Sequence, residues 1–96
     1  MKFIFHPDAE EELNDTVDYY EQCETGLGED FGAEVFAAIR NILSYPKSWP
    51  ILDGDARRCL TNRFPHGIIY SIEPEFIYVL AVMHLHRRPD YWKRRR

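Results

Sequence analysis

This chain contains few of the residues that build metal centres, disulfide scaffolds or phosphate-binding loops. Only two of its 96 residues are cysteine, Cys23 and Cys59, and neither has a second cysteine or a histidine at a metal-binding spacing. Its five glycines form no Gly-rich phosphate loop, and no Ser/His/Asp arrangement is present. We therefore expect no cofactor and no metal, and we expect both thiols to be buried or half-buried without a chemical role.

Long hydrophobic stretches are also absent. No apolar run approaches the roughly 18 residues needed to cross a bilayer, and the N-terminus has no basic stretch followed by a signal-type apolar segment. No stretch is of low complexity, while 45% of the residues are hydrophobic and 15% aromatic, enough for a compact core. We expect a cytoplasmic protein with no membrane partner, a single domain over residues 1–96 that ends in a basic tail at residues 89–96.

Charge is divided unevenly between the two halves of the chain. Residues 1–55 hold thirteen Asp or Glu side chains and three Lys or Arg side chains, a formal charge of −10, whereas residues 56–96 carry +6. The formal net charge is −4. A basic C-terminal half on an acidic protein predicts a positively charged face for an anionic partner, either a nucleic acid or an acidic protein segment. Charge alone does not choose between the two.

Hydrophobic periodicity predicts a strand, a helical hairpin and then a three-stranded meander. A β-prone run at residues 2–5 is stopped by Pro7, after which apolar residues at helical spacing indicate two helices separated by glycines. The last strand is apolar almost without interruption, which predicts a central position in the sheet. The expected helices span residues 8–24 and 29–45, the expected later strands 57–64, 68–72 and 76–83, and the turns 65–67 and 73–75. The aromatic residues expected to pack in the core or between helices and sheet are Tyr19, Tyr20, Tyr45 and Trp49.

Two stretches in the C-terminal half carry a specific pattern. Residues 57–70 read RRCLTNRFPHGIIY, an Arg-rich strand followed by a Phe-Pro turn and a tyrosine, and residues 84–92 read HLHRRPDYW. With the order of elements, these stretches resemble the RelE/ParE superfamily of type II toxin–antitoxin toxins, and within it the ParE-like branch. The resemblance covers nearly the whole chain. It implies an α+β fold in the order β-α-α-β-β-β, with the helical hairpin packed on one face of a small, mainly antiparallel sheet.

The resemblance implies one of two activities. RelE-like members cleave messenger RNA on the ribosome, whereas ParE-like members inhibit DNA gyrase, and in both a cognate antitoxin neutralises the toxin. RelE-like nucleases carry a basic residue in the middle strand of the meander, at a place that falls here on Gly67 or Ile68. A net charge of −4 also disfavours docking on ribosomal RNA, because phosphate neutralisation supplies much of that affinity. We therefore expect a growth-inhibiting gyrase inhibitor of the plasmid-stabilization type, with a metal-independent, ribosome-dependent endoribonuclease and a non-toxic binding module as the alternatives.

The candidate functional residues lie near the end of the last strand and after it, and Arg63 could face the same edge from a neighbouring strand. Two arginines followed by Pro89 and an aromatic pair form a rigid cationic platform suited to carboxylates or phosphates. The residues expected to bind the target are Arg63, His84, Arg87, Arg88, Tyr91 and Trp92. As a nuclease, the chain would instead use His84, His86, Arg87, Arg63 and Tyr91 for proton transfer and phosphate stabilisation.

Each of these residues also has a structural interpretation. His84 equally fits a hydrogen-bonding role at a strand end, while His86 and His66 are expected to be exposed. Tyr91 and Trp92 equally fit an aromatic lid packed back on the domain, and residues 93–96 are expected to be frayed.

Overall fold

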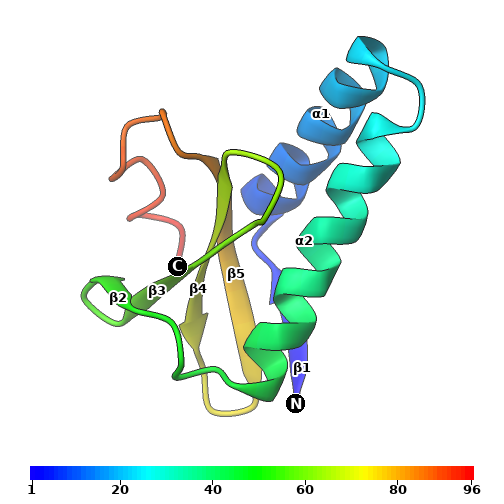
Figure 1. Cartoon of the computed structure of the whole chain (residues 1–96). Helices are drawn as coiled ribbons and strands as arrows, with labels where there is room; N and C mark the ends of the chain where they lie inside the picture. The colour runs from blue at the N-terminus through cyan, green and yellow to red at the C-terminus, as the bar shows by residue number, and fades with distance from the viewer.

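The computed structural model describes residues 1–96 as two helices packed on one face of a twisted five-stranded sheet (Figure 1). The elements are β1 (Lys2–Phe5), α1 (Pro7–Cys23), α2 (Leu27–Ser44), β2 (Ile51–Asp53), β3 (Ala56–Leu60), β4 (His66–Ile72) and β5 (Phe76–His84). The sheet order is β1-β5-β4-β3-β2, with β1 parallel to β5 and all other pairs antiparallel. The expected α+β class is confirmed. Residues 51–53, which were not expected to be extended, add a short edge strand.

Local signals at the helix ends explain the hairpin. His6 caps α1, because its Nδ1 accepts the backbone N–H of Asp8 at 3.0 Å. Gly26 adopts φ 90°, a conformation that side chains rarely tolerate, and so allows the tight reversal into α2. The carboxylate of Glu21 then accepts the backbone N–H groups of Gly26 and Gly28 at 2.9 and 3.1 Å. Neither helix is long and apolar enough to span a bilayer.

The main core lies between the helices and the sheet. Its buried members from α1 and α2 follow the stripes predicted from periodicity, and are Ala9, Leu13, Phe31, Val35, Ala38, Ile39 and Ile42. Two aromatic predictions are wrong, because Tyr19 is 62% exposed and Tyr45 is 66% exposed. Tyr20 and Trp49 do pack against the core.

The turn between β3 and β4 lies earlier in the chain than the sequence predicts. β3 ends at Leu60, and His66 already pairs with His84 in β5. Thr61 Oγ1 donates to the carbonyl oxygen of Phe64 at 2.7 Å, which closes a turn that begins four residues before the expected one. β5 is flanked by β1 and β4, which confirms its interior position.

Candidate functional site

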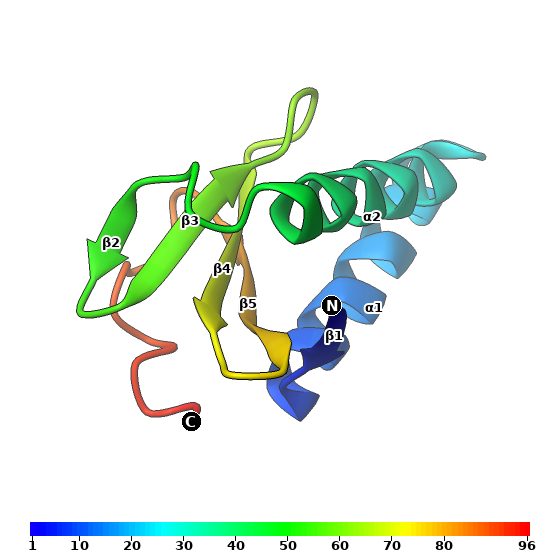
Figure 2. The same ribbon diagram turned by 90° about the horizontal axis from the view of Figure 1, so that it is seen from below.

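The chain after β5 folds back over the face of the sheet that the helices leave open. Figures 1 and 2 both place residues 85–96 on the opposite side of the sheet from α1 and α2. Trp92 is only 4% exposed. It packs in a second apolar cluster, with Ala56, Ile69, Leu80, Ala81 and Met83. The lid interpretation of Trp92 is therefore correct, and this side chain has almost no surface to offer a target.

Glu12 of α1 connects this C-terminal segment to β5. Its Oε1 accepts the backbone N–H of Val82 at 3.0 Å, and its Oε2 accepts Nη2 of Arg95 at 2.9 Å. Nη1 of Arg95 donates to the carbonyl oxygen of Leu80 at 3.1 Å. The side chains of Glu12 and Arg95 are only 14% and 12% exposed. The expectation of a frayed end at residues 93–96 is therefore wrong.

Tyr91 lies between the cations of the same segment. The guanidinium carbon of Arg87 is 3.7 Å from the centre of the Tyr91 ring and that of Arg95 is 4.8 Å from it. Nη1 of Arg87 also lies 3.5 Å from Oε2 of Glu12. The hydroxyl of Tyr91 is buried without a hydrogen-bond partner. Burial, together with the neighbouring Glu12 carboxylate, raises the pKa of Tyr91, so this phenol stays protonated and shielded at neutral pH.

Most cations of the basic half are paired with acids of the other half, which reduces the charge available to a partner. Lys93 Nζ lies 2.9 Å from Asp53, Arg96 pairs with Asp55, and Arg88 Nε lies 3.4 Å from Asp90 in its own segment. These pairs are exposed, and such pairs contribute little stability. Arg88 keeps 81% of its side chain exposed, and Arg87 keeps 53%. These two arginines, together with Arg94, which is exposed and has no ion pair, form the accessible part of the site.

The histidines at this end of the sheet have different environments. His66 was expected to be exposed, but it is only 3% exposed, with ring centroids of Phe31 and His84 at 4.7 and 5.0 Å. Burial, with a smaller effect of His84, lowers the pKa of His66 to about 4. His84 and His86 are exposed, and Nδ1 of His84 accepts the backbone N–H of His86 at 3.0 Å. His84 and His66 line a surface hollow of about 380 Å³, together with Asp15, Thr16, Tyr19 and Tyr20.

Arg63 does not join the C-terminal cluster. It lies in the turn before β4, where its guanidinium group is 3.5 Å from Asp30 and its backbone N–H donates to Glu34 at 2.9 Å. Both partners belong to α2, whereas the partner of Arg87 belongs to α1. Among the residues expected to bind the target, the structure thus joins Arg87, Tyr91 and the supporting Trp92, but leaves Arg63 apart.

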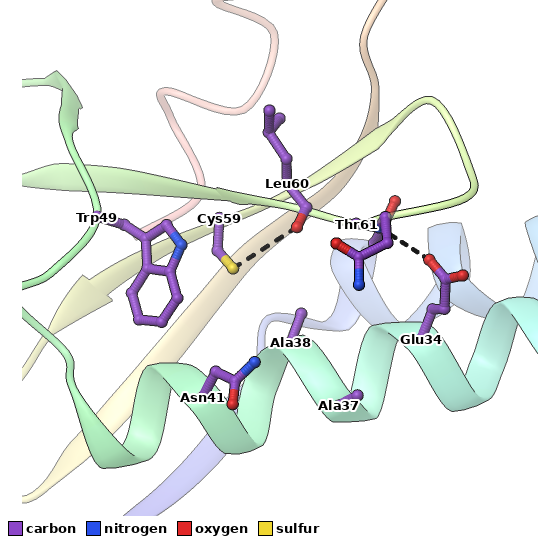
Figure 3. Close-up of a pocket in the computed structure, with 9 residues that line it drawn as sticks. Glu34, Ala37, Ala38, Asn41, Trp49, Cys59, Leu60 and Thr61 are labelled. Carbon is purple, nitrogen blue, oxygen red and sulfur yellow. Dashed lines mark hydrogen bonds between the residues drawn. The ribbon is translucent and has the colours of Figure 1, made fainter.

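A second hollow, of about 170 Å³, lies between α2 and β3 (Figure 3). Glu34 closes one end of it through hydrogen bonds to the turn, and Cys59 lies in its wall. Burial raises the pKa of the Cys59 thiol to about 11, so the thiol is protonated and unreactive at neutral pH. Cys23, by contrast, is exposed, contrary to the expectation for both cysteines. The arrangement fits a packing hollow and offers no reactive group.

Comparison with known proteins places this architecture in a family. The family model described as the ParE toxin of the type II toxin–antitoxin system parDE matches residues 3–89. The chain belongs to the ParE toxin family. It is accordingly a toxin of the type II toxin–antitoxin class, as the sequence pattern predicts.

A solved structure agrees with the ParE fold. The chromosomal ParDE toxin–antitoxin system from P. aeruginosa contains a chain that is similar with a TM-score of 0.79, over 90% of this chain and 97% of that one, at 12% sequence identity. At that identity, the likeness concerns the fold. No curated protein matches the chain.

The ParE match includes the exposed Arg87 and Arg88 and also Glu12, but not Tyr91, on which Arg87 stacks, or Arg95, which shares the Glu12 carboxylate with Arg87. Arg87 and Arg88 lie within the matched residues 3–89, whereas Tyr91 and Arg95 lie beyond them. Sequence reasoning missed Glu12 and Arg95 as members of the site. The acidic residues near the start of α1 had a sufficient local explanation in the helix dipole, and nothing in the sequence marks Glu12 as the one that faces β5.

Proposed function

We propose that this ParE-family chain inhibits DNA gyrase by binding it, and that a cognate antitoxin blocks this binding. The proposal depends on one observation above all: the C-terminal segment has exposed arginines, whereas the Tyr91 hydroxyl is buried, so that of the candidate proton-transfer groups in this region only His84 and His86 are exposed. Arg87 and Arg88 keep 53% and 81% of their side chains exposed, while the hydroxyl of Tyr91 is buried. Such a surface is suited to binding an acidic protein region, and less suited to proton transfer on RNA.

The binding surface would be formed by the outer side of the C-terminal segment. A hollow of about 440 Å³ opens there, lined by Arg88, Asp90, Tyr91, Lys93 and Arg94. Because the guanidinium group of Arg87 is held over the Tyr91 ring, it would meet a carboxylate with little loss of side-chain freedom. Trp92 would act indirectly, by fixing the segment to the sheet. His84 would border the surface, whereas Arg63 would be a peripheral contact.

The antitoxin would neutralise the toxin by covering the same surface. A segment with acidic side chains would pair with Arg87 and Arg88, and its apolar side chains would cover neighbouring residues such as Leu85, which is 39% exposed. Because gyrase acts on the chromosome, this function places the protein in the cytoplasm, and loss of the antitoxin with a plasmid would account for plasmid stabilization.

The direct test is a supercoiling assay with purified gyrase and the purified chain, comparing wild type with Arg88→Ala and Arg40→Ala. Arg88 is exposed at the proposed surface, whereas Arg40 is an exposed arginine on α2 with no ion pair. We expect wild type to inhibit supercoiling, Arg88→Ala to need about tenfold more protein, equivalent to about 1.4 kcal/mol of binding, and Arg40→Ala to behave as wild type.

A parallel experiment in cells identifies the target independently. After induction without the antitoxin, DNA breaks and loss of supercoiling with intact messages are expected. Codon-positioned cleavage of translated messages, with supercoiling unchanged, would instead show a ribosome-dependent nuclease, and normal growth would show a non-toxic binding module. Either of these results would refute gyrase inhibition.

A further inference from the structure

The partly buried carboxylate of Glu12 lies beyond the turn in which acidic side chains favour the start of its helix. Glu12 follows the first turn of α1, where Asp8 and Glu10 lie near the unpaired N–H groups. Its side chain is 14% exposed and is directed at β5 and the C-terminal segment rather than at solvent. Burying a carboxylate is costly unless its partners compensate, so the contacts of Glu12 require an explanation in the fold or in the function.

One oxygen of Glu12 completes the edge of the sheet. β1 pairs with β5 only as far as Val79, whose carbonyl oxygen accepts the N–H of His6 at 2.9 Å. Beyond that point the outer edge of β5 has no neighbouring strand. Glu12 accepts the N–H of Val82, and Arg95 donates to the carbonyl oxygen of Leu80. Side chains from α1 and from the C-terminal segment thus replace the missing strand, because buried backbone groups must find partners.

The other oxygen of Glu12 holds the cations of the proposed surface. Arg95 lies at 2.9 Å and Arg87 at 3.5 Å from the same Oε2, and both guanidinium groups contact the Tyr91 ring. Without this carboxylate, two like charges would share one aromatic ring, with only the more exposed Asp8, 3.9 Å from Nε of Arg95, as a remaining counter-charge. Repulsion would then favour release of Arg87 or of the whole segment.

We propose that Glu12 is the positioning residue of the toxin, holding Arg87, Tyr91 and Arg95 in the arrangement that the target meets. The role in target binding rests on the proposed function, whereas the attachment of the C-terminal segment by Glu12 does not. Glu12 belongs to α1, 83 residues before Arg95 of the surface that it organises. The local sequence of the C-terminal segment is therefore insufficient for activity.

The test compares Glu12→Gln with Glu11→Gln. Gln at position 12 preserves shape and an acceptor for the Val82 N–H but removes the charge, and Glu11 is an exposed neighbour with no ion pair or hydrogen bond. Hydrogen–deuterium exchange of the free chain should be at least about tenfold faster over residues 85–96 in Glu12→Gln, and unchanged in Glu11→Gln. Growth inhibition after induction, at equal soluble protein, should fall at least fivefold in Glu12→Gln alone.

A stability control separates positioning from simple weakening of the fold. Leu13→Ala empties a core position that is 6% exposed, next to Glu12, without touching the cluster. At a temperature where all variants are folded, Leu13→Ala should keep its toxicity even if it unfolds at a lower temperature than Glu12→Gln. Arg95→Gln should reproduce the loss seen in Glu12→Gln, and the double variant should add little, because both changes remove the same ion pair.

The outcomes distinguish this inference from the proposed function. Unchanged exchange over residues 85–96 in Glu12→Gln, or full toxicity despite faster exchange, would overturn the positioning role. Equal loss of toxicity in Leu13→Ala would overturn it as well. A wild-type chain that slows growth without inhibiting gyrase would refute the proposed target alone, since growth inhibition still measures the effect of Glu12. A wild-type chain that does not slow growth would refute the proposed function and the role of Glu12 in target binding, whereas hydrogen–deuterium exchange would still test the attachment of residues 85–96 by Glu12.

Discussion

Removal of the Trp92 side chain should uncover the second face of the sheet. Trp92 is 4% exposed and is the large residue that covers Ile69, Leu80 and Met83 there. Truncating a buried tryptophan to alanine costs about 3–5 kcal/mol. In a domain of this size, each kcal/mol corresponds to a change of about 4–8 °C in Tm, so Trp92→Ala should lower the Tm by about 12 °C or more.

Two further variants make the assay specific. Nε1 of Trp92 is buried without a hydrogen-bond partner, which costs about 1–3 kcal/mol, so Trp92→Phe loses part of the ring but also removes this unpaired donor. We expect Trp92→Phe to lie within about 1 kcal/mol of wild type, given these opposing effects. Tyr19→Ala, at an aromatic residue that is 62% exposed, should change stability by no more than about 0.5 kcal/mol.

Urea unfolding followed by far-ultraviolet circular dichroism measures all three variants. A cost below about 1 kcal/mol for Trp92→Ala would mean that the C-terminal segment does not cover the sheet. In that case the arrangement of Arg87 and Tyr91 would lose its support. A similar loss in Tyr19→Ala would instead mean that the assay does not report on burial.

Three other predictions follow from buried and close-packed groups. The pKa of His66 is lowered by burial from 6.5 to about 4, so the folded chain takes up a proton at this side chain less readily than the unfolded chain does. The free energy of unfolding should therefore fall by about 3 kcal/mol as the pH drops from about 6.5 towards 4. The His66→Phe variant should lack this part of the pH profile of unfolding. Iodoacetamide at mildly alkaline pH should label the folded chain once, at exposed Cys23 and not at Cys59, whose pKa is about 11; mass spectrometry that finds both labelled without unfolding would contradict the packing. Gly28→Ala should destabilise the chain by more than about 1 kcal/mol, because the added Cβ would lie 2.4 Å from a backbone oxygen of α1. Gly32→Ala should instead stabilise the chain by up to about 1 kcal/mol, because the nearest atom to its Cβ would be 3.9 Å away. Equal changes in the Tm of the two variants would refute this account of the hairpin.

Much of the fold could be predicted because its signals are local and repeated. The spacing of Ala9 and Leu13 in α1, and of Phe31 and Val35 in α2, identifies the buried faces of both helices before any contact is known. Errors arose where a tertiary contact overrides a local signal. The Pro65-His66-Gly67 sequence resembles a turn, yet the side chains of Thr61 and Glu34 close the reversal earlier, and His66 enters the sheet.

The candidate site could be predicted only in part. Arg87 and Arg88 stand next to each other in the sequence, so the sequence places two cations together after β5, but it does not determine whether both are exposed. The burial of Trp92 could not be inferred, since an aromatic residue near a chain end fits a lid and a target contact equally well. Tyr45 shows the opposite error, as a residue that continues a buried stripe by spacing but lies beyond the end of α2, where the sheet no longer covers it.

The sequence by itself determined the class of fold, the order of its elements, the ParE-like family and the position of the cations along the chain. These properties depend on hydrophobic periodicity and on short motifs, both of which involve residues that are close together in the sequence. Only the tertiary structure decided which cations remain exposed and what holds them. Glu12 and Arg95 are 83 residues apart, and their ion pair exists because the helix and the returning chain end meet at the uncovered edge of β5. The spacing of residues in the sequence does not predict this contact, because the contact depends on where the sheet, α1 and the C-terminal segment pack together.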